Sequence, residues 1–101
     1  MRKGQTESIS DVLDALAGRL GIRKQLKRAQ VINEWADIVG ERIAKETRPD
    51  RIKGAVLFVA CSGSVWAQEL TFLQPEIIKK IRERVGPGIV ADIRFRTGQI
   101  S

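Results

Sequence analysis

The sequence lacks histidine and tyrosine and contains a single cysteine. Without histidine there is no His-dependent catalytic triad, no imidazole zinc ligand and no His general base. Cys61 alone cannot form an internal disulfide or a Cys-rich zinc site, which favours a reducing, cytoplasmic location. No apolar run approaches the ~20 residues that cross a bilayer, and residues 1–7 contain no apolar stretch of the kind found in secretory signals. The sequence therefore predicts neither a cofactor, a metal nor a membrane partner.

The chain has 101 residues, of which 18 are Lys or Arg and 12 are Asp or Glu, so its net charge is +6. This length fits one domain, and we expect a basic tail over 1–5 followed by a single domain over 6–98. The 43% hydrophobic share is typical of a globular chain. The positive balance favours a polyanionic partner, above all nucleic acid.

Hydrophobic spacing predicts helices in the first half of the chain. An apolar stripe of Ile9, Val12, Leu13, Leu16 and Leu20 predicts one helix that ends near Gly18 or Gly21. Further helical spacing predicts a short helix over 23–28 and a longer one over 29–45, either separate or fused. We expect the apolar stripes of all these helices to pack on one sheet face.

The second half contains the strands. The sequence predicts a β-hairpin over 46–53 and 55–61, with Pro49 confining the first strand to an edge. A helical stretch follows, in which Pro75 is either a kink or the start of a second helix. Alternation over 89–97 predicts a last strand that buries Ile93 and Phe95. The predicted class is α+β, order α-α-α-β-β-α-β, with helices on one face of a three-stranded sheet.

Few residues suggest catalysis. Glu34, Asp37 and Glu41 share a helical face and could hold a hard cation, but a solvated face with Glu41 paired to Lys45 explains them better. Cys61 follows an apolar stretch and has no His partner, so it is expected to be a small buried hydrophobic residue. We therefore expect a protein that is not an enzyme.

Basic residues are the strongest functional signal. No acid lies between Asp14 and Glu34, and Arg94 and Arg96 share the polar face of the last strand. A polyanion-binding surface and an ordinary solvated face explain the first group equally well. We rank that group ahead of the strand pair because more cations make a stronger field. The candidate nucleic-acid-binding residues are Arg19, Arg23, Lys24, Lys27, Arg28, Arg94 and Arg96.

Two further patterns bear on binding. Gly18 to Gly21 form a GxxG, which in KH domains lets a nucleic-acid backbone approach, although a helix end followed by a turn explains it better. The Phe and Trp residues lie mostly on apolar stripes, so the sequence predicts no stacking platform and binding with little sequence preference. Trp35 and Trp66 are expected to be mostly buried, with partner contact as the alternative for Trp66.

Three segments in this order resemble the bacterial DciA-like family: Trp35 to Gly40 (WADIVG), Thr47 to Pro49 (TRP) and Ser64 to Leu70 (SVWAQEL). The similarity runs from about Ser8 to Gly98. The resemblance implies a KH-like domain that binds DNA, single- or double-stranded, and acts with the replicative helicase in helicase loading at chromosome replication. A KH-like RNA-binding protein and a protein-interaction adaptor with a basic surface remain the alternatives.

Overall fold

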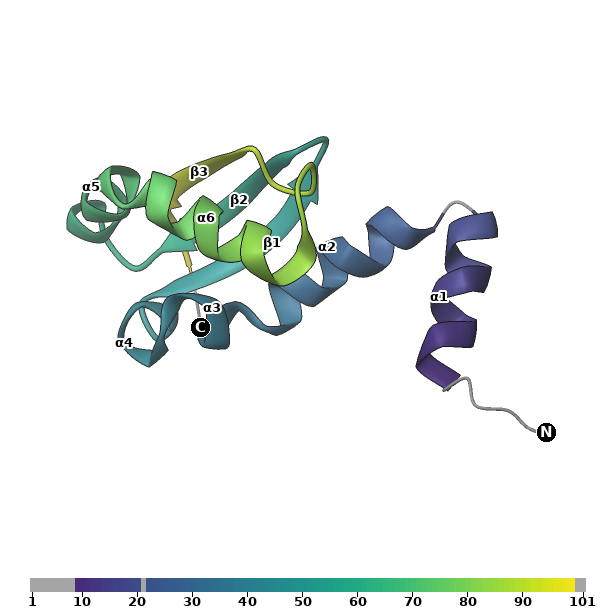
Figure 1. Ribbon diagram of the computed structural model, residues 1–101. Coiled ribbons are helices and arrows are strands. Elements are labelled where there is room, and N and C mark those ends of the chain that lie inside the picture. Colours follow the sequence, from purple (N-terminus) through teal and green to yellow (C-terminus); the bar gives the residue numbers. More distant parts are fainter. Residues whose placement is uncertain (1–8, 21, 100–101) are drawn as a thin grey trace.

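The structure is a computed structural model that describes residues 9–20 and 22–99 (Figure 1). A helical region leads into a hairpin, a helical pair and a final strand, which confirms the expected KH-like α+β class. The expected tail over 1–5 lies outside the described residues. The elements are α1 (Ile9–Leu20), α2 (Arg23–Asn33), α3 (Trp35–Val39), α4 (Glu41–Ala44), β1 (Thr47–Lys53), β2 (Val56–Cys61), α5 (Ser64–Phe72), α6 (Gln74–Val85) and β3 (Asp92–Thr97).

The three strands form one sheet in the order β1-β2-β3. β1 and β2 are antiparallel and are joined at Gly54, whose positive φ of 63° suits a tight turn. β2 and β3 are parallel, with α5 and α6 making the crossover between them. The register of β1 shifts between Pro49 and Arg51, which leaves Asp50 as a bulge on this edge strand.

One face of the sheet carries the hydrophobic core. Leu57, Val59 and Cys61 of β2 are fully buried there, under helices that contribute Trp35 and Ile81. The Trp35 indole N–H donates to Thr47 Oγ1 at 2.9 Å, and that hydroxyl donates to the Ile43 carbonyl at 2.8 Å. The polar atom of Trp35 is thus satisfied inside the core, and the expected burial of Trp35 is confirmed at 3% exposure.

Several element boundaries differ from the sequence prediction. The predicted boundary between a helix over 23–28 and one over 29–45 is wrong, because α2 runs unbroken from Arg23 to Asn33. The two are not fused into one helix either, since the chain then forms the separate helices α3 and α4 on either side of Gly40. Gly40 has φ of +93°, which ends the helical path. Pro75 lies in the first turn of α6, so it starts a second helix rather than kinking one.

The last strand begins later than its sequence alternation suggested. β3 starts at Asp92, because Ile89 and Val90 are both buried in a loop and do not alternate between faces. The amides of Ala91 and Asp92 donate to the Ala55 carbonyl, which fixes this loop beside the start of β2. Burial of two consecutive residues depends on how the loop packs, and the sequence pattern does not report it. The start of β3 could therefore not be placed from the sequence.

Helix α1 contradicts the expectation that every apolar stripe packs on the sheet. It lies apart from the sheet and makes its main contacts with α2 (Figure 1). Ile9, Val12, Leu13 and Leu16 are 40–79% exposed. Ile22 and Leu26, at the start of the next helical segment, are also exposed. An amphipathic stripe predicts that a helix has an apolar face but not which surface covers it.

Candidate nucleic-acid interface

The second face of the sheet is lined by cations. Strand register places alternate residues opposite the core, because neighbouring side chains on a strand point to opposite faces. The burial of Leu57, Val59 and Ile93 identifies the core side, so their neighbours in sequence lie on the other. We call this second side the open face. Its residues are Arg48, Arg51 and Lys53 from β1, Val56, Phe58 and Ala60 from β2, and Asp92, Arg94 and Arg96 from β3.

The open face is arranged in rows that run across the three strands. Arg51, Phe58 and Arg94 are cross-strand partners, so the aromatic ring lies between two arginines. The next row, Arg48, Ala60 and Arg96, again has an apolar centre between cations. The guanidinium carbon of Arg51 lies 5.1 Å from the centre of the Phe58 ring, within the range of a cation–π contact.

Two carboxylates lie among the five cations of the open face. Asp50, in the bulge, is 3.1 Å from Arg51 and 3.8 Å from Arg96. Asp92 accepts from Arg94 Nε at 3.0 Å and from Gln74, and these hydrogen bonds lower the pKa of its carboxyl group. The arginines of these pairs are about 60–70% exposed in their side chains. Such solvent-exposed pairs are weak, so the guanidinium groups can exchange partners for a phosphate.

The candidate cations of residues 19–28 differ in their surroundings in the structure. The Arg23 guanidinium donates to the Asp14 carbonyl of α1 at 3.0 Å, and that of Arg28 donates to the Gly54 carbonyl at 2.6 Å. Both arginines therefore hold elements together. Lys24 is exposed and Lys27 is half-buried. The side chain of Arg19 and the glycine at position 21 lie outside the described residues, so the GxxG segment is described only in part, with Gly18 inside α1.

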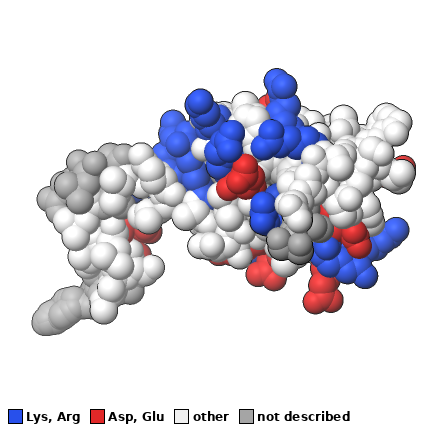
Figure 2. All heavy atoms as spheres, turned by 180° about the vertical axis from the view of Figure 1, so that it is seen from behind, with Lys and Arg blue, Asp and Glu red and all other residues white. Residues whose placement is uncertain are grey.

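The bond from Arg28 to Gly54 places the middle of α2 beside the hairpin turn that Lys53 precedes. The helical and strand cations consequently lie on neighbouring surfaces. Figure 2 shows Lys and Arg gathered over the upper part of the molecule next to α1, with few acidic groups among them. Together the two groups form a basic surface that no single sequence segment contains.

Sequence reasoning found Arg94 and Arg96 but missed their neighbours. Their projection away from the core is confirmed, since they alternate with buried Ile93 and partly buried Phe95. The sequence placed the aromatic residues mostly on core stripes, but Phe58 lies on the open face and is partly exposed there. Residues 55–61 are apolar on both faces, so only pairing with two Arg-bearing strands reveals which side is open.

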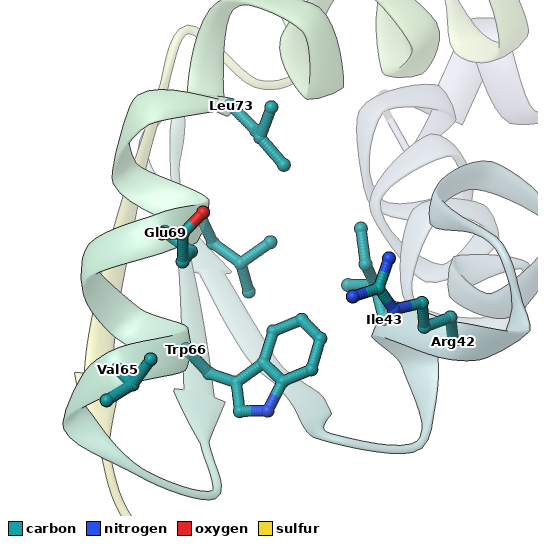
Figure 3. A pocket seen from close by; sticks show the side chains of 7 residues that line it. Arg42, Ile43, Val65, Trp66, Glu69 and Leu73 are labelled. Carbon is teal, nitrogen blue, oxygen red and sulfur yellow. The ribbon is translucent and has the colours of Figure 1, made fainter.

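The second tryptophan is mostly buried, as expected, but less completely than Trp35. Trp66 is partly exposed at the rim of the core and lines a hollow of about 380 Å³ between α4 and α5, with Ile43, Val65 and Leu73 (Figure 3). The Arg42 guanidinium lies 5.9 Å from its ring centre.

The remaining candidates show no catalytic arrangement. Arg84 pairs with Glu34 at 2.8 Å, and this hydrogen bond lowers the pKa of the Glu34 carboxyl group. Cys61 is buried, and burial raises the pKa of its thiol. Within residues 9–20 and 22–99, no three His, Cys, Asp or Glu side chains are placed to hold a metal ion. None of the helices in that part of the chain combines the length and the hydropathy needed to span a membrane.

A one-sided three-stranded sheet, with helices on one face and cations on the other, defines a small α+β domain of the KH-like class. The sequence matches the family described as "Dna[CI] antecedent, DciA" over residues 8–95. The chain therefore belongs to the DciA family, as its sequence motifs indicated.

Curated relatives agree with this assignment. The chain is 36% identical to a UPF0232 protein of Corynebacterium glutamicum over 89 residues, which cover 88% of this chain and 50% of that protein. It is 31% identical to a UPF0232 protein of Rhodococcus jostii, over 81% of this chain and 44% of the relative, and 30% identical to one of Mycobacterium leprae, over 88% and 47%. The chain thus spans about half the length of the curated relatives it matches.

Proposed function

We propose that this chain is a non-enzymatic DNA-binding domain that acts with the replicative helicase, in helicase loading at DNA replication, in the cytoplasm at the nucleoid. The observation that carries the proposal is the open face, where five cations and two carboxylates surround the apolar residues of β2. Membership of a family described as the antecedent of DnaC and DnaI supports the part that concerns the helicase.

Binding to such a surface is driven mainly by phosphate contacts. Each Lys or Arg that neutralises a phosphate releases condensed counterions, so log affinity falls linearly with log salt. Arginine is suited to this role because its planar guanidinium can donate two parallel hydrogen bonds to one phosphate. The register adds Arg48, Arg51 and Lys53 to the strand pair. We therefore propose the open face as the main site and the lysines of α2 as an extension of it.

The test measures the anisotropy of a labelled oligonucleotide at several salt concentrations. Changing Arg94 and Arg96 together to Ala should weaken binding and flatten the salt slope by about 0.7–0.9 for each lost phosphate contact. Changing Lys24 and Lys27 should have a smaller effect. The matched control is Lys79 and Lys80 on α6, both exposed, whose change to Ala should leave binding unaltered. Equal losses in all three variants, or salt-independent binding, would contradict the proposed site.

The part of the proposal that concerns a protein partner has its own support. The apolar stripe of α1 and the hollow beside Trp66 are exposed surfaces of the kind that bind proteins. The host's replicative helicase should be retained by the immobilised chain after nuclease treatment. Retention that disappears with the nucleic acid would contradict a direct helicase contact while leaving the nucleic-acid-binding proposal intact.

A further inference from the structure

The position of Phe58 is unusual for the largest apolar side chain of a central strand. It lies on the open face, partly exposed, and is not part of the core cluster that holds its neighbours Leu57 and Val59. The covered face has a partly buried phenylalanine of its own, Phe95, which packs against that core. The core is therefore complete without Phe58, and its partly exposed ring lies on the open face between two arginines.

We propose that Phe58 is a base-stacking site, on which an unpaired base of a single nucleic-acid strand lies while the flanking arginines bind the adjoining phosphates. This inference rests on the proposed function, because it assigns a base contact to the surface that binds the backbone. The phosphate contacts need only the nucleic-acid backbone, whereas this additional contact needs a base.

The arrangement around the ring favours a single strand over a duplex. A base can stack on a protein ring only when its own face is free, which pairing within a duplex prevents. The Arg51 guanidinium carbon lies 5.1 Å from the Phe58 ring centre, and this exposed side chain can move aside for a base or present its own plane to one. An unpaired base thus meets a ring and a guanidinium at the centre of the sheet. Aromatic side chains on an open sheet face serve this purpose in other nucleic-acid-binding folds.

The spacing of the cations fits the same occupant. Neighbouring strands lie about 5 Å apart and successive same-face positions roughly 7 Å apart, so four arginines surround Phe58 and Ala60 at short range. They are Arg48, Arg51, Arg94 and Arg96. Ala60 is only 9% exposed and lies close to Gly98, so the apolar surface open to a strand is centred on Phe58 rather than on Ala60. Charge complementarity thus places phosphates on both sides of the stacked base.

The experiment compares two variants against two probes. Phe58→Leu keeps an apolar side chain on the open face but removes the aromatic ring, and Phe95→Leu makes the same change on the covered face. The first probe is a thymidine homopolymer and the second an oligonucleotide of equal length made of abasic sites, with the same phosphates and no bases. Thermal unfolding of both variants monitors folding, so a loss of binding is assigned only to folded protein.

We expect a loss of affinity only for the Phe58→Leu variant and only with the thymidine probe. The parent chain should bind the thymidine probe about fivefold or more tightly than the abasic probe, which is the effect of a single stacked base. Phe58→Leu should remove this preference while leaving abasic and duplex binding within twofold. Phe95→Leu should retain the preference. Matched deoxyuridine and uridine homopolymers then distinguish a DNA strand from an RNA strand, since they share the base and differ at the 2′ position.

Three other outcomes would overturn the inference, and they differ in what else they affect. If Phe58→Leu binds thymidine and abasic probes as the parent does, the stacking site is wrong but the phosphate-binding proposal stands. If the parent binds no oligonucleotide even at low salt, both fail. Binding of a poly-glutamate peptide in place of every oligonucleotide would assign the open face to an acidic protein instead.

Discussion

The two faces of β2 are equally apolar in sequence but occupy different environments. Leu57, Val59 and Cys61 are fully buried against helices, whereas Val56 and Phe58 on the opposite side are partly exposed beside cations from β1 and β3. The difference arises from the flanking strands, since β1 and β3 place their apolar residues towards the helices and their arginines away. A hydrophobic run thus contributes to stability on one side and can serve binding on the other.

The largest expected effect is a loss of stability caused by a substitution in the hydrophobic core on the covered face. Changing Trp35 to Ala should lower the free energy of unfolding by about 3–5 kcal/mol, because it empties a large buried volume. It also removes the hydrogen-bond donor to Thr47 Oγ1. Denaturant titration followed by circular dichroism measures this loss. A decrease below about 1 kcal/mol would show that the helices do not enclose this face as described.

Trp66 should have an intermediate effect, because it lies at the rim of the covered side. Changing Trp66 to Ala should cost about 1–2 kcal/mol, less than the same change at Trp35, since only part of its surface is removed from water. The same titration measures it, with Trp35→Ala as the internal comparison. Equal losses for the two variants would place Trp66 in the core after all.

A small, pH-dependent effect is expected at the exposed contact between α6 and the end of α2. Hydrogen bonds from Arg84 and then Gln30 hold the pKa of Glu34 below its usual range. A lowered folded-state pKa contributes stability at neutral pH, which is lost as pH falls through the folded-state pKa. Glu34→Gln should therefore be slightly less stable than the parent at pH 7 and should equal it in strong acid. Denaturant midpoints across pH measure the difference, and a gap that widens in acid would contradict this sign.

Much of the candidate site was visible in the sequence, but only as separate pieces. Arg94 and Arg96 were identified because strict alternation marks a half-buried strand, and their orientation is confirmed. Arg48, Arg51 and Lys53 were missed because the proline and the bulge at Asp50 interrupt the alternation of β1. Phe58 was missed because a strand with apolar residues on both sides gives no indication of which side is covered.

The sequence by itself determined the class of fold, the hairpin, the burial of Trp35 and the family. These depend on local periodicity, turn residues and motifs, all of which are properties of neighbouring positions. Only the tertiary structure decided that α1 lies apart, that Trp66 lines a hollow beside α4 and that Phe58 lies among arginines. These features depend on which distant segments meet, and a periodic pattern identifies the apolar side of an element without identifying its partner.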